Sequence, residues 1–434
     1  MRREKTALRE NRKGKPQFFR SLFSRRIQWE SQDESKSADS IRRRAEGMKI
    51  TRMDVYTVDA GWRNWIFVVL STDNGYVGAG EATTVYNESL TLAALEDLRE
   101  IVIGTDPRNI EAFWARMTKS LYWYYAHMVL YSAMAAIDHA MWDIVGKWLE
   151  TPCYRLMGGA VRDSIRLYAN TWFLGACTPE EYAQRAATVV AAGWDAIKWD
   201  PFPGSYMTLS SSEVDAAVEN VRAVRDAVGP DIDLLIETHG RLNVESAVRA
   251  GRALEEFRPF WYEEPVLPNN PAVLRRVKEQ VRIPIAGGER TAGRWGTLPF
   301  LSNGAMDIIQ PDMTQAGGLS EVGKIAALAE MYGVLVAPHC PRGPVAVAAG
   351  VQLGACTRNF LILEYPTDMG GIPWRQDLIM EPEQIVNGRM PLPDKPGLGV
   401  ELNVKALVKH KAKQKVLEIP NYYERTFTIP AAQS

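Results

Sequence analysis

The amino-acid sequence predicts an α/β fold in which an α+β domain precedes a (β/α) barrel. The chain has 434 residues, which is enough for two or three domains. Strand patterns come before helical patterns in the first part, whereas strands and helices alternate from about residue 164 onward. The alternating part contains about eight units of roughly 30 residues, which is the size of a complete barrel.

Residues 1–47 are predicted to be a disordered basic extension. They contain 14 Lys or Arg residues and seven Asp or Glu residues, so the segment is basic while the remainder of the chain is acidic. It lacks the apolar stretch of a secretory signal, and its acidic residues argue against a transit peptide. We interpret it as an extension or as the product of an upstream start codon ahead of Met48. An arm that binds nucleic acid or a membrane is the alternative.

Residues 48–163 are predicted to form the α+β domain. Ile50–Val58 and Trp65–Leu70 alternate as strands do, and the loop Ala60–Asn64 between them carries aromatic and basic residues. Asn74-Gly75 supplies the positive φ angles of a tight hairpin. Residues 87–158 follow as helices. An apolar stripe with helical spacing comprises Met134, Ile137, Met141 and Ile144.

Residues 164–372 are predicted to form the barrel. The expected strands are Ile165–Ala169, Ala196–Trp199, Leu234–Glu237, Phe260–Glu263, Ile283–Ala286, Asp307–Gln310, Val334–Ala337 and Phe360–Leu363. Helical segments such as 179–192 and 213–227 lie between them. The pattern ends near residue 373, so residues 373–410 are expected to return to the first domain, and residues 411–434 are expected to be a tail.

Polar side chains follow nearly every expected barrel strand. Active sites of such barrels lie at the carboxyl ends of the strands, so these residues share one rim. The rim set comprises Asn170, Lys198, Asp200, Glu237, His239, Glu263, Glu264, Glu289, Asp312, His339 and Glu364. So many ionisable groups at one rim indicate an active site.

Three of these residues predict a metal site. Glu237, Glu263 and Glu289 follow successive strands at intervals of 26 residues, about one barrel unit. Three neighbouring carboxylates repel one another, and a cation would relieve that repulsion. A set of oxygen ligands selects a hard divalent ion, and Mg²⁺ would keep positions open for substrate and water. The alternative is three unrelated surface glutamates.

Two histidines are candidates for proton transfer. His339 follows an apolar strand, and Asp312 ends the preceding one, so Asp312 could hold one ring nitrogen and leave the other as a base. His239 lies two residues beyond Glu237, on the same face and next to the expected metal. The alternative for His339 is a histidine that only satisfies a core hydrogen bond.

Lys198 and Asp200 are expected at the same rim because they lie two residues apart. Lys198 could pair with the carboxylate of a substrate. It could equally form an internal ion pair with Asp200, and the spacing alone leaves both interpretations open.

Composition and missing motifs exclude several function classes. The net charge of −1 gives no overall field for nucleic acid or membranes, and no apolar run approaches the roughly 20 residues that span a bilayer. Four cysteines without a CxxC pair predict free thiols in a reducing compartment, which we take to be the cytoplasm. The sequence has no P-loop, dinucleotide fingerprint or GxSxG elbow.

The chain resembles the mandelate racemase subgroup of the enolase superfamily, and within it the sugar-acid dehydratases of the gluconate and galactonate type. The resemblance covers about residues 48–405. The motifs that carry it are Ser132–Asp138 with Met141–Asp143, Leu156–Gly159, Tyr168–Trp172, Lys198–Phe202, Ile236–Arg241, Tyr262–Pro265, Gly288–Arg290, Gln310–Asp312, Gly317-Gly318, Ala337–His339 and Pro396–Val400.

The resemblance implies a modified (β/α)8 TIM-type barrel under an α+β capping domain, with Glu237, Glu263 and Glu289 as Mg²⁺ ligands. It also implies His339 with Asp312 as the base dyad. Glu364 resembles the last-strand acid that hydrogen-bonds the substrate carboxylate. The other expected substrate-binding residues are Asn170, Lys198, Asp200 and Arg290, with Arg63 from the cap loops around 62–65 and 85–87. Glu237 stands where aspartate is commonest in the subgroup. Asp200 replaces the second lysine of the Lys-x-Lys of the racemases, which weakens a two-base racemisation.

The function that the resemblance implies is dehydration of a small sugar acid. His339 would take the C2 proton, His239 would protonate the departing C3 hydroxyl, and the enol product would become a 2-keto-3-deoxy acid. Members of this family often form homo-oligomers, so a homo-oligomer is expected. The alternatives are a racemase or epimerase of a related hydroxy acid, and a non-catalytic metabolite-binding protein.

Overall fold

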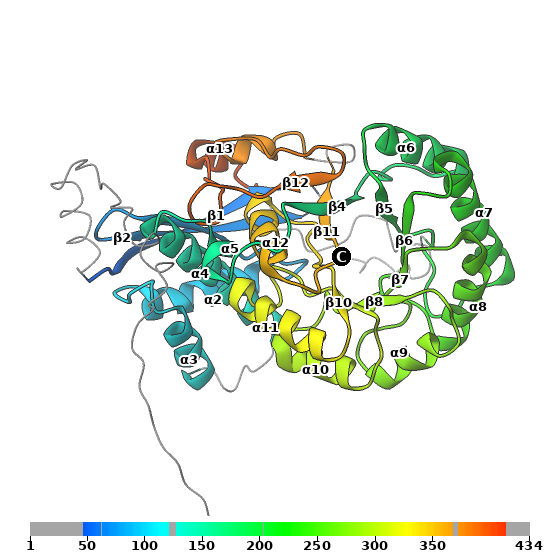
Figure 1. The fold of residues 1–434 in the computed structure, drawn as a ribbon, viewed down its shortest axis with the longest axis horizontal. Helices are drawn as coiled ribbons and strands as arrows, with labels where there is room; N and C mark the ends of the chain where they lie inside the picture. Colours follow the sequence, from blue (N-terminus) through cyan, green and yellow to red (C-terminus); the bar gives the residue numbers. More distant parts are fainter. Residues whose placement is uncertain (1–46, 62, 121–126, 203, 368–371, 414–434) are drawn as a thin grey trace, which may run out of the picture. The chain divides into compact units, whose positions relative to one another are not determined.

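The structure is a computed structural model that describes residues 47–61, 63–120, 127–202, 204–367 and 372–413 (Figure 1). The fold below belongs to one compact unit, Met48–Ser434. The predicted extension lies outside the described residues except for Gly47. The predicted tail lies outside them except for residues 411–413.

The α+β part is a three-stranded antiparallel sheet with helices on one side. Its strands are β1 (Ile50–Asp59), β2 (Asn64–Thr72) and β3 (Val77–Glu81), in that order. Its helices are α2 (Glu88–Val102), α3 (Ile110–Ser120), α4 (Met128–Trp148) and α5 (Cys153–Leu156). Strand β2 is apolar on both faces because both faces are covered. Ile66, Val68 and Leu70 join the core under the cap helices, whereas Trp65, Phe67 and Val69 join the core shared with the barrel.

Helix α4 is buried on nearly every side, and small residues let its neighbours approach it closely. A Cβ added at Gly80 of β3 would lie 1.8 Å from the Ala136 carbonyl oxygen, and one at Gly78 would lie 2.1 Å from that of Ala140. Only glycine therefore fits at these two strand positions. On α4, Asp138 accepts a hydrogen bond from the backbone N–H of Ser320 (3.1 Å), which ties the cap to the barrel.

The barrel follows as eight strands joined by parallel ladders. The strands are β4 (Ser164–Asn170), β5 (Ala196–Trp199), β6 (Asp233–Glu237), β7 (Trp261–Glu263), β8 (Ile285–Gly287), β9 (Ile308–Ile309), β10 (Leu335–Val336) and β11 (Leu363–Pro366). The order runs from β10 through β9 to β4 and then β11, and a bridge between Val336 and Phe360 joins β10 to the segment before β11. The strands therefore form the ring seen in Figure 1.

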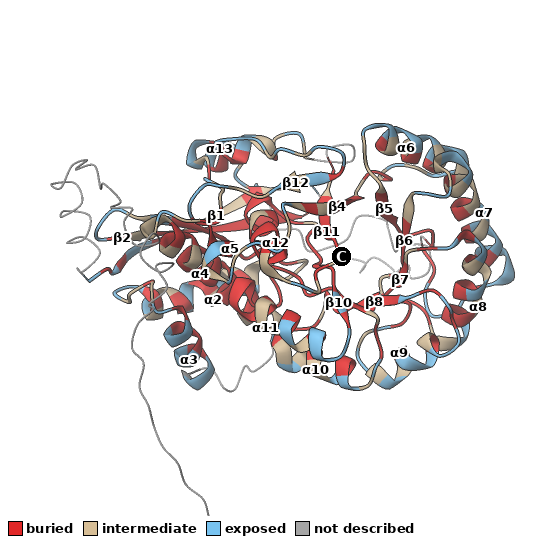
Figure 2. Ribbon diagram, viewed as in Figure 1, coloured by how far each residue is buried: buried red, intermediate tan, exposed pale blue. Residues whose placement is uncertain are grey.

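Within the described ranges, seven α-helices surround the ring. They are α6 (Pro179–Ala191), α7 (Ser211–Val228), α8 (Val244–Leu254), α9 (Pro271–Lys278), α10 (Gly293–Ser302), α11 (Gly318–Met331) and α12 (Pro344–Cys356). Capping boxes at Thr178–Glu181 and Ser210–Glu213 start α6 and α7. The strands are buried and the outer helix faces are exposed (Figure 2). The predicted fold class, a (β/α) barrel with an α+β domain, is confirmed.

The segment after the eighth barrel strand differs from the helix that the prediction of eight strand–helix units expects there. Among the described residues after β11, the next elements are the 3₁₀ helix η5 (Gln376–Leu378), strand β12 (Arg389–Pro391), which pairs antiparallel with β4, and helix α13 (Val404–Lys409). The chain then contacts the α+β part, where the N–H of Gly397 donates to Thr151 O (3.0 Å) and the N–H of Cys153 donates to Gly397 O (2.9 Å). The barrel is therefore a modified one. No helix of the described ranges is both long and apolar enough to cross a membrane.

We predict that a chain beginning at Met48 folds with the thermal stability of the full chain. Met48 and Ile50 are 1% and 0% exposed and pack in the cap core, so the folded unit needs them. A chain beginning at Thr51 should be less stable by roughly 1.5–3 kcal/mol for each of the two lost side chains. Thermal unfolding of the three chains tests this. A large loss of stability on removal of residues 1–47 alone would contradict it.

Candidate active site

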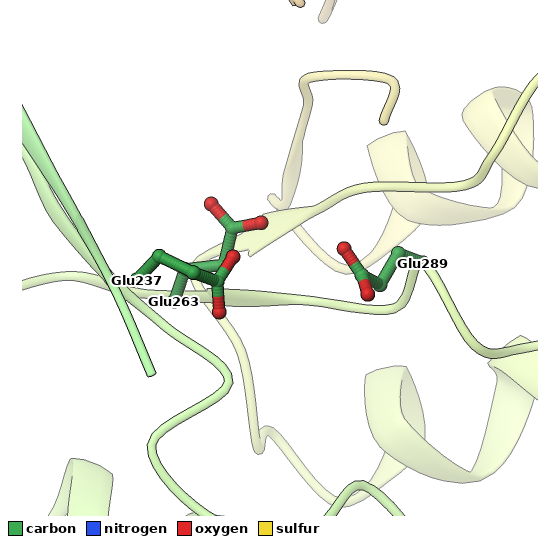
Figure 3. Close-up of side chains that lie close together, drawn as sticks. All are labelled: Glu237, Glu263 and Glu289. Atoms are coloured by element: carbon green, nitrogen blue, oxygen red, sulfur yellow. The ribbon is translucent and has the colours of Figure 1, made fainter. Parts of the chain in front are cut away.

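Three glutamates converge at the carboxyl ends of neighbouring strands. Glu237 ends β6, Glu263 ends β7, and Glu289 follows β8. One carboxylate oxygen of each lies within 4.8 Å of the other two, and Figure 3 shows Glu289 facing the other two carboxylates. The side chains are almost completely buried, with residue exposures of 1%, 0% and 9%. The sequence spacing thus brings these three residues together as predicted.

The environment of these carboxylates suits a divalent cation. Burial raises the pKa of Glu237 to about 7, although Lys198 opposes the rise. Burial and the neighbouring Glu237 raise the pKa of Glu263 well above its usual value. Oε1 of Glu237 accepts hydrogen bonds from the N–H groups of Thr238 and His239, whereas its buried Oε2 has no hydrogen-bond partner. A cation bound here would neutralise the repulsion and provide that oxygen with a partner.

Lys198 lies against the same cluster. Its Nζ is 2.8 Å from Glu263 Oε1, 3.1 Å from Glu364 Oε1 and 3.6 Å from Glu237 Oε2. Burial alone would lower the pKa of Lys198, but the surrounding carboxylates raise it well above its usual value. The surrounding carboxylates therefore favour the ammonium form of Lys198. Its ion pairs are with three glutamates, and Asp200, the other candidate partner, binds elsewhere.

His339 forms the predicted dyad with Asp312. Its Nδ1 lies 2.6 Å from Asp312 Oδ2, and its Nε2 lies 3.1 Å from Glu289 Oε2, facing the cluster. Burial alone would raise the pKa of Asp312, but Arg342 and His339 hold it well below its usual range. Arg342 donates from Nε (2.9 Å) and Nη2 (2.6 Å) to the same Oδ2. Asp312 thus fixes the imidazole through Nδ1, and Nε2 faces Glu289 and the cluster.

His239 forms a second dyad that the sequence spacing did not predict. Its Nδ1 lies 2.7 Å from Asp200 Oδ2, and Arg241 Nη2 pairs with the same oxygen. The N–H of Phe202 donates to Asp200 Oδ1 (2.8 Å). Asp200 is fully buried and both of its oxygens are occupied by these protein groups. It was predicted to bind substrate, but its position is behind His239.

The two histidines stand on opposite sides of the ring. His239 follows β6 and His339 follows β10, and four steps separate these strands in the eight-strand order. The strands between them contribute Glu263, Glu289 and Asp312. A substrate held at the carboxylate cluster would therefore lie between the two imidazoles.

Comparison with known proteins agrees with this geometry. A family model described as "Mandelate racemase / muconate lactonizing enzyme, N-terminal domain" matches residues 40–158, and one described as "Enolase C-terminal domain-like" matches residues 181–406. The chain belongs to the mandelate racemase/muconate lactonizing enzyme family of the enolase superfamily. The resemblance seen in the sequence is thereby confirmed.

Several relatives of this family member have assigned names. It is 37% identical to D-gluconate dehydratase of Thermoproteus tenax over 363 residues, which cover 83% of this chain and 72% of the relative. It is 36% identical to D-galactonate dehydratase of Pectobacterium atrosepticum over 369 residues, covering 83% and 94% of the two chains. A crystal structure of an enolase-superfamily member from Salmonella Typhimurium matches with a TM-score of 0.80 and 36% identity, covering 83% and 98%.

The remaining predicted site residues of this family member lie around the cluster. Glu364 is fully buried and accepts hydrogen bonds from Asn170 Nδ2 and from the N–H of Cys340 (2.8 Å). Arg290 Nη2 donates to the carbonyl oxygen of His239 (2.9 Å), and its Nε lies 3.5 Å from Glu289 Oε1. Glu364 and Arg290 therefore contact the two histidine segments directly, whereas Asn170 contacts Glu364.

Arg63 connects the cap to the segment that follows His339. It lies in the loop between β1 and β2, is 8% exposed, and donates from Nη1 to the carbonyl oxygen of Pro341 (3.2 Å). Burial and the nearby Arg342 lower the pKa of Arg63 to about 9. Trp62, which the sequence placed in the same specificity loop, lies outside the described residues.

Sequence reasoning assigned no role to Arg241 or Arg342, although both hold an aspartate behind a histidine. Each arginine follows its histidine by two or three residues, and that shared spacing was the available signal. The spacing could not reveal which carboxylate each guanidinium meets, because the partner comes from the neighbouring strand end.

We predict that Mg²⁺ raises the unfolding temperature of the wild-type protein but not of Glu263→Gln. A ligand that binds only the folded state adds about 2.7 kcal/mol at a concentration about 100-fold above its Kd. The variant keeps the side-chain shape but loses a charged ligand, so this shift should largely disappear. Glu219→Gln, at an exposed position on α7, is the matched control and should keep it. An equal shift in Glu263→Gln would argue against metal ligation by this residue.

Proposed function

We propose that this protein is a Mg²⁺-dependent hydro-lyase that converts an aldonate into a 2-keto-3-deoxy acid and water. The observation that carries the proposal is the pair of histidines, each backed by an aspartate, on opposite sides of a three-carboxylate cluster. The names of the relatives, D-gluconate dehydratase and D-galactonate dehydratase, support the same reaction class. An aldonate has both the C2 proton and the C3 hydroxyl that this reaction removes.

Glu237, Glu263 and Glu289 would hold the metal ion. All the donors are carboxylate oxygens, which hard divalent cations such as Mg²⁺ prefer. When bound, Mg²⁺ supplies positive charge that stabilises the negative charge developing on the substrate carboxylate. Lys198, which stays protonated among its glutamate neighbours, adds a second positive charge for the same carboxylate. Glu364, held by Asn170, would accept a hydrogen bond from the substrate and orient it.

His339 and His239 divide the proton transfers. His339 Nε2 takes the C2 proton, while Asp312 and Arg342 hold the ring in place through Nδ1. The electrons of the broken C2–H bond form the C2–C3 double bond, and the C3–O bond breaks. His239 donates a proton to the departing oxygen, which leaves as water. The resulting enol rearranges to the 2-keto-3-deoxy acid, so the overall change is loss of one water.

The alternative functions are less well supported by the site. A two-base epimerase that used Asp200 would need this carboxylate to face the substrate, but Asp200 is fully buried behind His239. Lys198 is surrounded by carboxylates and would be a poor base. A non-catalytic binding protein would not need two histidine–aspartate dyads around a metal site.

The substrate acid would be selected from the cap side. Arg63 brings a guanidinium to the base side of the site, and Arg290 brings another beside His239. We propose that these two residues contact the distal hydroxyl groups of the substrate.

Screening aldonic and aldaric acids for 2-keto acid formation tests the proposal directly. With Mg²⁺ present, at least one aldonate should be dehydrated, and exhaustive chelation should abolish turnover because the carboxylate cluster then lacks its cation. Glu263→Gln should be inactive on the same acid. If no acid yields a 2-keto acid, or if turnover survives chelation in full, the proposal is wrong.

We predict that substitution of His339 and substitution of His239 affect different steps of the reaction. His339→Asn should lose both dehydration and exchange of the C2 proton with D₂O, because no base remains. His239→Asn should lose dehydration by on the order of 10² to 10⁴ while still exchanging the C2 proton, since His339 remains. NMR of the accepted acid in D₂O measures both quantities. Exchange that survives in His339→Asn but disappears in His239→Asn would reverse the two roles.

A further inference from the structure

Asp200 lies at the centre of a buried network whose other side chains are His239 and Arg241. Its Oδ2 is 2.7 Å from His239 Nδ1 and also pairs with Arg241 Nη2, and its Oδ1 accepts from the N–H of Phe202 (2.8 Å). Asp200 is 0% exposed and Arg241 is 7% exposed, whereas the His239 side chain is 30% exposed. The network therefore ends in one side chain that reaches the site.

Arg241 fixes the network to two strand-end loops. Its Nε donates to Thr238 O (3.0 Å), and its Nη1 donates to Phe202 O (2.8 Å) and Ser205 O (3.1 Å). These carbonyls belong to the loops after β6 and β5, so Arg241 joins them around Asp200. The Asp200 carboxylate consequently has little freedom to rotate.

The backbone of His239 is held as firmly as its ring. Its φ of +53° lies in the left-handed region, which a non-glycine residue rarely adopts. Its N–H donates to Glu237 Oε1, and its carbonyl oxygen accepts from Arg290 Nη2 (2.9 Å). With the backbone fixed, the bond to Asp200 sets the direction of the imidazole.

The base side has the same arrangement of groups. There, Arg342 and His339 Nδ1 share Asp312 Oδ2, as Arg241 and His239 Nδ1 share Asp200 Oδ2. In both cases the aspartate accepts from Nδ1, which leaves Nε2 as the atom that can exchange a proton with a substrate. Each of the two opposed strand ends therefore carries one His–Asp–Arg set, called a relay below, in which the arginine and the histidine Nδ1 contact the same aspartate oxygen.

We propose that Asp200 and Arg241 are positioning residues for the acid step. They hold the His239 ring so that Nε2 delivers its proton to the departing C3 oxygen. This inference rests on the proposed dehydration. In this proposal Asp200 assists only the cleavage of the C3–O bond, because His339 takes the C2 proton on the opposite side of the ring of strands. Loss of Asp200 or Arg241 should therefore slow the departure of the C3 oxygen as water and leave C2 proton removal in place.

A change of leaving group distinguishes this role from a general structural one. The 3-deoxy-3-fluoro analogue of the accepted acid also loses its C2 proton to His339, but it releases fluoride in place of water. Fluoride leaves as an anion, so its departure does not require proton donation from His239. Asp200→Asn should lower water loss by on the order of 10² to 10⁴ but lower fluoride release by less than about tenfold. Asp312→Asn is the matched control and should lower both. Product and fluoride are followed by NMR, together with C2 exchange in D₂O.

A double variant tests whether Asp200 acts through His239. Asp200→Asn combined with His239→Asn should lose no more water-elimination activity than His239→Asn alone, because residues that act as one unit are not additive. Arg241→Gln should show the same selective loss as Asp200→Asn, and it provides the test if Asp200→Asn fails to fold.

Several outcomes would overturn the inference. Equal loss of water and fluoride elimination in Asp200→Asn would show a general structural role, and near wild-type water loss would show no role. A double variant far slower than His239→Asn would show that Asp200 acts apart from His239. If the wild-type protein dehydrates no acid, the proposed function fails and this inference fails with it.

Discussion

Four carboxylates and one ammonium group are buried together at the carboxyl ends of the barrel strands, and this charge constraint organises the rest of the site. Lys198 pairs with Glu237, Glu263 and Glu364, and Arg290 and His339 lie near Glu289. Burial nevertheless raises the pKa of Glu237 to about 7 and that of Glu263 well above its usual value. A divalent cation at Glu237, Glu263 and Glu289 would relieve the repulsion between these carboxylates. The strand ends are where such a cluster can be built, because parallel strands deliver successive residues to one rim.

Asp200 and Asp312, the aspartates that contact the two histidines, are also buried carboxylates, and each of them pairs with an arginine. Burial opposes the charged form of both Asp200 and Asp312, and a buried guanidinium restores it in each case: it lowers the pKa of Asp200, and it holds that of Asp312 well below its usual range. Each aspartate can then remain a hydrogen-bond acceptor for an imidazole Nδ1. Because His239 follows β6 and His339 follows β10, the two histidines lie on opposite sides of the cluster formed by Glu237, Glu263 and Glu289.

The cap contributes to the site through buried carboxylates that meet barrel amides. Glu81 of β3 accepts from the N–H groups of Gly343 (2.7 Å) and Ala346 (3.0 Å) at the start of α12, directly after Arg342. Anionic side chains are favourable at helix N-termini, so this contact stabilises the junction. A Cβ at Gly343 would lie 2.8 Å from Glu81, which explains the glycine. The segment that carries the base relay is therefore braced from the cap.

The sequence by itself determined the barrel, the rim where Glu237, Glu263 and Glu289 meet, and the His339–Asp312 pair. The reason is periodicity: Glu237, Glu263 and Glu289 recur every 26 residues, and one strand–helix unit returns the chain to the same rim each time. Tertiary structure decided the partners of Lys198, the pairing of Asp200 with His239, and the roles of Arg241 and Arg342. These contacts join loops from neighbouring strands, and the positive φ of His239 turns its side chain away from the strand alternation that the spacing assumed. The position of β6 opposite β10 also follows from closure of the ring of strands. The order of strands in space is a property of the fold, and local sequence does not specify it.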